Sequence, residues 1–212
     1  MTVDAALARL AHVGAAAPSV MPAVEAGVPG RLRAVGADLL AGLVAVDVAV
    51  VDLLVSIRTP TLTKGMTSVT GLGSATAAAV FLGIFYLAGW RRDLAVGAVA
   101  IGVVGLVVPA LMYLVQRPFP SSPVCMTSGS GLTPHSFPSG HAAAVTVFAL
   151  VSRGSDHLPF RAVTALAATV AVSRIYLGTH YLSDTVAGIA IGVVAFVVGR
   201  ALAPRVRPLL PE

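Results

Sequence analysis

Two histidines bracket a run of turn-forming residues between Pro134 and His141, with the sequence Pro-His-Ser-Phe-Pro-Ser-Gly-His. An apolar run follows directly, so a helix is expected to begin near Ser139 and Gly140. The first turn of a helix has unpaired N–H groups and a partial positive charge, and phosphate binds readily there. Glycine lets an anion approach the backbone, and the imidazole of His141 can transfer a proton near neutral pH. The pattern predicts an anion site beside a titratable group.

Two arginines are placed to hold the same anion. Arg117, followed by Pro118, ends one apolar run, and Arg174 lies near the end of another. Guanidinium groups bind phosphoryl oxygens through forked hydrogen bonds, and the hydroxyl of Ser139 adds a neutral donor. Both arginines adjoin apolar runs long enough to enter a membrane. Inserting a charged side chain there costs about 2.5–3.5 kcal/mol, so two arginines at this depth indicate a functional site. We therefore expect Arg117, Arg174, Ser139 and Gly140 to bind phosphate.

Three further residues complete a phosphoryl-transfer reaction. His180 can attack phosphorus through a ring nitrogen. Asp184 follows four residues later, on the same face if the segment is helical, and could hold the other ring N–H and fix the tautomer. His141 would protonate the leaving oxygen and then deprotonate the water that releases the phosphate. The arginines supply the positive charge that a metal supplies elsewhere, so we expect neither a metal nor a cofactor.

The composition indicates the environment in which this chemistry takes place. Of 212 residues, 57% are hydrophobic and only 11% are charged, and the mean hydropathy is +0.90, which is too apolar for an ordinary soluble domain. The net charge of +5 comes from residues at the ends of apolar runs, which is typical of a membrane protein and does not indicate a nucleic-acid partner. A single cysteine excludes an internal disulfide.

Six apolar runs predict an all-α fold of six transmembrane helices. Five runs approach the length of about 20 residues that a span needs, and the fourth is shorter. A short fourth helix must begin below the membrane surface, so the preceding loop, 116–138, must be enclosed by protein or line a wet cavity. The runs comprise residues 35–57, 71–90, 94–115, 139–152, 160–178 and 183–203.

The charges also predict an orientation. With the N-terminus inside, ten of the fourteen Lys and Arg residues lie on the cytoplasmic side, as the positive-inside rule requires. We expect a cytoplasmic or interfacial segment, 1–33, a membrane domain, 34–203, and a cytoplasmic tail, 204–212. Both termini would then lie in the cytoplasm and the site on the extracytoplasmic face.

The chain resembles the PAP2 (type 2 phosphatidic acid phosphatase) superfamily in three motifs. Ser-Phe-Pro-Ser-Gly-His at 136–141 is similar to its second motif, and Ser-Arg, five residues, His, three residues, Asp at 173–184 is similar to its third. Arg117-Pro118 resembles the end of its first motif. The resemblance covers about 35–203 and implies six membrane helices, a metal-free phosphohistidine mechanism, and a lipid phosphate or diphosphate as substrate.

The first motif departs from the family pattern, because Ala110 stands where the family has a lysine. Lys64 and Arg58, on the preceding outer loop, could replace that charge. His135 and Pro118 adjoin the motifs and are candidate substrate contacts. Asp47 and Asp52 lie within the first apolar run, and a functional role and a structural hydrogen bond are equally open for both.

We expect an enzyme of a bacterial-type plasma membrane that hydrolyses a polyprenyl (undecaprenyl-type) diphosphate. Phosphatidylglycerophosphate, phosphatidate or another prenyl-linked phosphate would meet the same arginines and remains the alternative within this class. A non-catalytic phospholipid-binding protein with a degenerate site is the alternative outside it. The missing lysine favours that reading, whereas His180 and Asp184 oppose it, since binding alone needs no nucleophile. The sequence gives no indication of oligomeric state.

Overall fold

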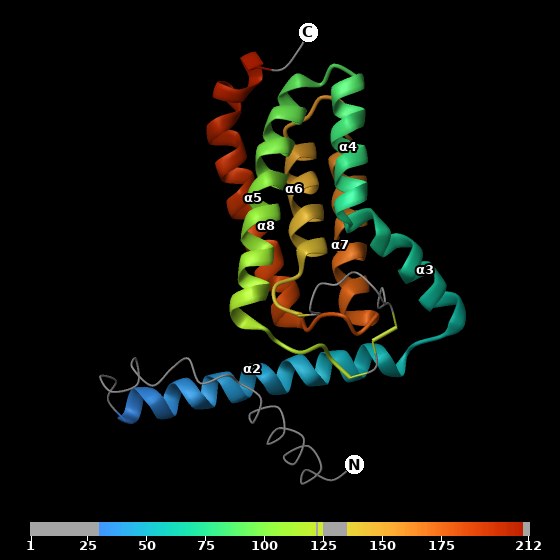
Figure 1. The fold of residues 1–212 in the computed structure, drawn as a ribbon. Helices are drawn as coiled ribbons and strands as arrows, with labels where there is room; N and C mark the ends of the chain where they lie inside the picture. The colour runs from blue at the N-terminus through green and yellow to red at the C-terminus, as the bar shows by residue number, and fades with distance from the viewer. Residues whose placement is uncertain (1–29, 122, 125–134, 210–212) are drawn as a thin grey trace. The chain divides into compact units, whose positions relative to one another are not determined.

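The computed structural model describes residues 30–121, 123–124 and 135–209, and in these residues every regular element is helical (Figure 1). The all-α prediction is therefore confirmed for the described residues. The helices are α2 (Gly30–Ser56), α3 (Pro60–Thr70), α4 (Ala75–Leu87), α5 (Arg91–Val115), α6 (Gly140–Arg153), α7 (Phe160–Tyr176) and α8 (Leu182–Val206), with short 3₁₀ turns η2 (Gly71–Gly73) and η3 (Arg207–Leu209).

The chain divides into two compact units, residues 1–42 and 43–212. The described part of the first unit is the beginning of α2, and the contacts discussed below all lie within the second unit. The interfacial segment expected at 1–33 falls outside the described residues as far as residue 29, and α2 begins at Gly30.

Among the residues that the structure describes, three helices are long and apolar enough to cross a membrane: Val35–Ser56, Arg91–Val115 and Leu182–Val206. A bent pair, Pro60–Gly73 with Ala75–Leu87, adds a fourth if it forms one broken span, and its two parts meet at an angle of 56°. The chain is thus a multi-pass membrane protein with three or four candidate spans. Six crossings remain a prediction, since α6 and α7 are shorter, with 14 and 17 residues.

The segment between the first two apolar runs was expected as an outer loop, but most of it is helical. Thr59 accepts the N–H of Leu62 at 3.2 Å and Pro60 occupies the first turn, so this polar sequence begins α3. Ser74 in turn accepts the N–H of Ala77 at 3.1 Å and starts α4 after the bend. Side-chain capping by Thr59 therefore starts α3, and capping by Ser74 starts α4 after the bend.

The bundle depends on glycines that bring α8 against its neighbours. A Cβ atom on Gly188 would lie 2.3 Å from the carbonyl oxygen of Ser139, and one on Gly192 would lie 2.6 Å from that of Ala143. Small residues at four-residue spacing allow this close approach of backbones in membranes. As a result α5, α6, α7 and α8 run side by side (Figure 1), and the start of α6 lies against the start of α8.

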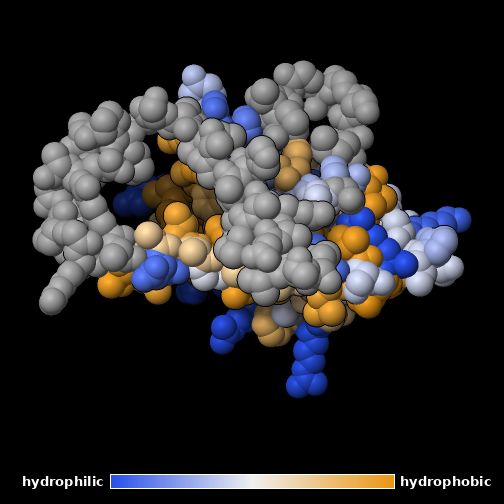
Figure 2. All heavy atoms as spheres, turned by 90° about the horizontal axis from the view of Figure 1, so that it is seen from below, coloured by the Kyte–Doolittle hydropathy of each residue, from blue (hydrophilic) through white to orange (hydrophobic). Residues whose placement is uncertain are grey.

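Apolar side chains are abundant on the outside of this bundle. Leu106, Tyr113 and Leu114 on α5 are 76%, 76% and 73% exposed, as is expected for a surface that faces lipid. Figure 2 shows apolar groups reaching the surface beside hydrophilic ones. Inside, small residues such as Ala95, Ala100 and Ala143 pack fully buried, which keeps the helices close.

The close approach at Gly188 predicts the cost of a single methyl group. Gly188→Ala should lower the free energy of unfolding by about 1–3 kcal/mol, because the added Cβ meets backbone that cannot yield. The measurement is thermal unfolding in detergent followed by circular dichroism. Gly105→Ala is the matched control, since a Cβ there meets nothing within 4 Å; equal stability of the two variants would contradict the packing described.

Candidate active site

His180 lies in the turn between α7 and α8 and is only 4% exposed. Gly178, with φ of 70°, reverses the chain after α7, and the N–H of His180 donates to the carbonyl of Arg174 at 3.2 Å. The ring atom Nδ1 hydrogen-bonds to the carbonyl oxygen of Ser136. A carbonyl can only accept, so Nδ1 carries the proton and Nε2 keeps its lone pair. The fold thus selects the tautomer that a nucleophile needs.

Asp184 has a different role from the one expected from its spacing. Its Oδ2 atom lies 4.0 Å from Nδ1 of His180, beyond hydrogen-bond distance, and instead accepts the N–H of Tyr181 at 2.8 Å. The prediction that Asp184 orients the imidazole directly is therefore wrong. The spacing does place the carboxylate beside the ring, but the Ser136 carbonyl is closer and occupies Nδ1.

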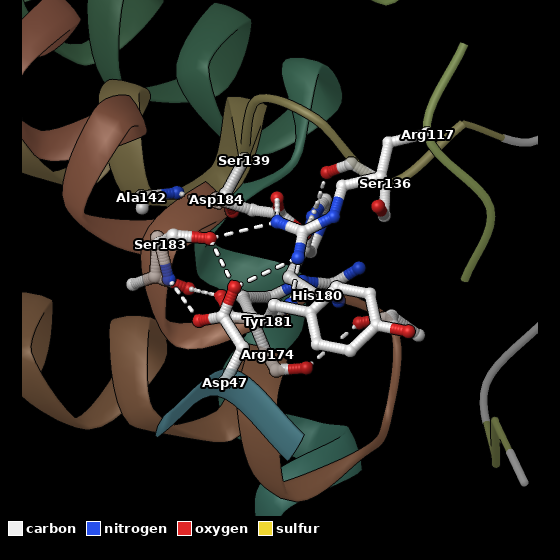
Figure 3. A network of polar contacts seen from close by, with 12 residues as sticks. Asp47, Arg117, Ser136, Ser139, Ala142, Arg174, His180, Tyr181, Ser183 and Asp184 are labelled. Atoms are coloured by element: carbon white, nitrogen blue, oxygen red, sulfur yellow. Dashed lines mark hydrogen bonds and ion pairs between the residues drawn. The ribbon is translucent and has the colours of Figure 1, made fainter. Parts of the chain in front are cut away.

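Arg117 bridges two carboxylates (Figure 3). Its Nη1 donates to Oδ1 of Asp184 at 2.5 Å and to the hydroxyl of Ser183 at 2.7 Å, and its Nη2 donates to Oδ2 of Asp47 at 2.7 Å. The guanidinium also lies 4.0 Å from the ring centroid of Tyr181. Partial burial opposes the charge, but the two carboxylates outweigh that effect and raise the pKa of Arg117. Its hydrogen bonds in this structure go to two carboxylates and one hydroxyl of the protein itself.

Asp47 is the member of this network that the motifs do not identify. It is 1% exposed, and its Oδ1 accepts the N–H of Ser183 at 2.8 Å while its Oδ2 accepts the Ser183 hydroxyl. Figure 3 shows it reaching Ser183 and Arg117 from a separate helix, α2. The sequence signal was a carboxylate in an apolar run. Asp52 shares that signal, yet it is exposed, so only position and packing separate the two.

Arg174 stands on the other side of His180. Its side chain is buried, and Nη1 donates to the hydroxyl of Thr70 at 2.8 Å, which connects α7 to the end of α3. Burial first, and the positive charge of Arg174 second, lower the pKa of His180 from 6.5 to about 3. A lowered pKa means that the imidazole is neutral throughout the range from pH 5 to 8, so its Nε2 lone pair is available.

The start of α6 completes the group. Ser139 is fully buried, its N–H donates to the carbonyl of Asp184 at 3.0 Å, and its hydroxyl caps the helix by accepting the N–H of Ala142 at 3.4 Å. Gly140 and His141 follow in the first turn and are half-buried. The charge of His141 also contributes to the lowered pKa of His180, so the two rings lie within electrostatic range.

The backbone of η2 packs directly on His141. A Cβ atom on Gly73 would lie 2.9 Å from Cβ and 3.0 Å from Cδ2 of the histidine. Glycine at this position therefore leaves room for the imidazole. The 3₁₀ turn after α3 was not part of the predicted site, because no motif contains it.

The remaining candidates lie at the edge of the group. Pro118 is exposed and its carbonyl accepts the hydroxyl of Ser136 at 3.0 Å, so it holds the loop that orients His180. His135 is half-buried and Lys64 is exposed on α3. Their contact with substrate remains a prediction. Within the described residues, no three His, Cys, Asp or Glu side chains are grouped so that they could hold a metal ion.

Comparison with known proteins places the chain in context. A family model described as the PAP2 superfamily matches residues 94–207. Decaprenylphosphoryl-5-phosphoribose phosphatase of Mycobacterium tuberculosis is 34% identical over 111 residues, a match covering 52% of this chain and 62% of that protein. Phosphatidylglycerophosphatase B of Bacillus subtilis is 29% identical over 167 residues, which are 71% of this chain and 79% of the relative. The chain thus spans less than two thirds of the length of the first of these relatives.

Two crystal structures have a similar fold. The membrane PAP2-type phosphatidylglycerolphosphate phosphatase of Bacillus subtilis aligns with a TM-score of 0.65 at 24% identity, over 78% of this chain and 88% of that one. LpxE of Aquifex aeolicus aligns with a TM-score of 0.61 at 22% identity, over 73% and 94% respectively. At these identities the likeness concerns the fold.

The network around Asp47 predicts that this residue stabilises the site. Asp47→Ala should lower the free energy of unfolding by about 2 kcal/mol, because Arg117 and the N–H of Ser183 lose a buried acceptor. Thermal unfolding in detergent measures the loss. Asp52→Ala, on the exposed face of the same helix, should change it by less than about 0.5 kcal/mol; a similar loss in both variants would show that Asp47 has no special role.

Proposed function

Because the chain belongs to the PAP2 superfamily and is a multi-pass membrane protein, we propose that it is a lipid phosphatase with His180 as its nucleophile. The observation that carries this proposal is the state of the imidazole. The ring is buried and neutral, with Nδ1 bound to the Ser136 carbonyl and Nε2 free to react. A protein that only binds lipid would not need a histidine held in one tautomer.

In the first step, Nε2 of His180 attacks phosphorus and forms a P–N bond while the P–O bond to the lipid breaks. The leaving oxygen takes a proton from His141. Burial first, and the charge of Arg174 second, lower the pKa of His141 to about 3 in this structure, and the negative phosphate must raise that pKa for the ring to be protonated when substrate is bound. Nδ1 keeps its proton on the Ser136 carbonyl, so the phosphohistidine forms without a second proton transfer. Arg174 and the N–H groups at the start of α6 neutralise the phosphoryl oxygens.

In the second step, water replaces the histidine. His141, now neutral, removes a proton from the water, whose oxygen attacks phosphorus as the P–N bond breaks. Phosphate leaves, His180 regains its lone pair and His141 is again protonated. Asp184 acts through Arg117 and the N–H of Tyr181, which holds the turn that carries the nucleophile.

An apolar cavity beside the site supports a lipid substrate. It has a volume of about 140 Å³ and is bounded by residues of η2, α4, α6 and α7, including Leu72 and Val170. Both residues flank Gly73, which packs on His141. A hydrocarbon chain in this cavity would leave its headgroup phosphate next to the histidines.

The charges of the site favour a phosphomonoester over a diphosphate. Asp47 and Asp184 already neutralise Arg117, and Ala110 occupies the position of the family's lysine. Arg174, whose Nη1 donates to the hydroxyl of Thr70, adds a second positive charge to the site. A terminal monoester brings less negative charge than a diphosphate, so it meets less repulsion from the two carboxylates. The names of both sequence relatives also denote lipid-linked phosphates. The polyprenyl diphosphate expected from the sequence is the alternative.

The same proposal includes the predicted topology. Six crossings in a plasma membrane would put both termini in the cytoplasm and His180 on the extracytoplasmic face. The excess of Lys and Arg on one side of the spans supports this orientation.

The two histidines should fail at different steps. His180→Ala should reduce phosphate release by at least about a thousandfold, and no ³²P should be retained on the protein. His141→Ala should also be slow but should retain ³²P on His180 when an activated ester is the substrate, because water is no longer activated. Excess EDTA should leave wild-type turnover unchanged. Release of phosphate by His180→Ala at the wild-type rate would exclude this mechanism and favour a non-catalytic lipid-binding protein.

Substrate choice is tested by comparing phosphatidylglycerophosphate, phosphatidate and undecaprenyl diphosphate under one detergent condition. The kcat/KM for the better monoester should exceed that for the diphosphate by about tenfold, since one uncompensated charge raises the barrier by about 1.4 kcal/mol. The opposite order would establish the diphosphate and show that other cations reach the site.

A further inference from the structure

A second cavity lies at the other end of the bundle, where α6 ends. Its volume is about 480 Å³, several times that of the apolar cavity beside His141. On α6 the cavity begins at Leu150, eleven residues after Ser139, a length of about 16 Å along the helix. This cavity is therefore separate from the candidate active site and from the apolar cavity beside it. It is lined by Arg92, Asp93, Val96, Leu150, Val151, Arg153, Gly154, Phe196 and Arg200.

Three arginines from three helices line the cavity. Arg92 comes from the first turn of α5, Arg153 from the end of α6 and Arg200 from α8. All three are exposed, so their charged groups remain available to a ligand. They outnumber the one lining carboxylate, Asp93, which is buried and accepts a hydrogen bond from Ser155. The cavity has an excess of positive charge.

The backbone fixes part of this arrangement. Arg92 donates through Nη1 to the carbonyl of Gly154, the residue that ends α6. A Cβ atom on Gly154 would lie 3.1 Å from Nη2 of Arg92, so glycine gives the guanidinium room to lie against the chain. The guanidinium of Arg200 lies 5.8 Å from the ring centroid of Phe196, which helps to hold it at the wall.

The other walls are apolar. Val96, Leu150 and Phe196 line the cavity below the arginines, on helices of which α5 and α8 are candidate membrane spans. A ligand with a phosphate head and a hydrocarbon body would match both parts. Basic pockets between membrane helices bind anionic headgroups in this way.

We propose that this cavity binds the phosphate group of an anionic phospholipid in the leaflet opposite the active site. Free phosphate shares the charge that the arginines recognise but would leave the apolar wall unfilled, and this wall is the reason to assign a lipid. The proposal does not depend on the function proposed for His180. Bilayer lipid would occupy the cavity as a ligand, without being hydrolysed there.

Native mass spectrometry of the full chain in a zwitterionic detergent tests the proposal. The probes are phosphatidylglycerol, phosphatidylcholine and inorganic phosphate, each titrated separately. We expect saturable binding of one phosphatidylglycerol and much weaker binding of the other two. Arg153→Gln combined with Arg200→Gln should weaken phosphatidylglycerol binding about thirtyfold, since each arginine near an anionic headgroup contributes about fivefold. This pair leaves the bond between Arg92 and Gly154 intact.

Arg161→Gln combined with Arg205→Gln is the matched control. These arginines are exposed at the same end of the bundle but do not line the cavity, and the variant loses the same charge. Its binding should stay within about twofold of wild type. Equal weakening in both pairs, or binding of phosphate as tight as that of phosphatidylglycerol, would overturn the proposal. Unchanged helicity and phosphate release show that each variant is folded. If the Gln pair fails to fold, the single variants Arg153→Gln and Arg200→Gln replace it, and each should weaken phosphatidylglycerol binding about fivefold.

Discussion

One half-buried guanidinium holds the site together. Arg117 is only partly accessible and pairs with Asp47 and Asp184, which are 1% and 0% exposed. Moving an unpaired carboxylate from water into a bilayer would cost free energy. The ion pairs and hydrogen bonds with Arg117 offset that cost for Asp47 and Asp184. The network joins α2, the segment after α5 and the start of α8, which are far apart in the chain. Removing Arg117 would leave two buried carboxylates without a counter-charge, and removing either carboxylate would take an acceptor from the guanidinium.

Backbone hydrogen bonds connect this network to His180 and to the start of α6. The N–H of Ser136 donates to the carbonyl of Arg117 at 2.8 Å, and the Ser136 carbonyl in turn accepts Nδ1 of His180. The N–H of Ser139 donates to the carbonyl of Asp184, so the starts of α6 and α8 are bonded directly. Gly188 permits that contact because it has no side chain. His180, the proposed nucleophile, is therefore positioned mainly by peptide groups, whose geometry does not change with protonation.

The two ends of α6 have different charge balances. At its start, two carboxylates pair with one arginine, so the proposed mechanism assigns anion binding to Arg174 and to helix N–H groups. At its end, three arginines face a single buried carboxylate. The first arrangement suits a phosphate that must be released after reaction, since excess positive charge would retain the product. The second suits a ligand that stays bound.

The sequence by itself determined that the chain is helical and membrane-bound, and it predicted which residue types carry the chemistry. The motifs around His141 and His180 indicated the groups that we propose to react, because their spacing reflects local turns and helix starts. Only the tertiary structure decided which groups touch. It placed the Ser136 carbonyl on His180, assigned Asp184 to Arg117, separated Asp47 from Asp52 and gathered the arginines at the end of α6. These contacts join residues up to 136 positions apart. Packing of whole helices sets such distances, and no local pattern in the chain encodes them.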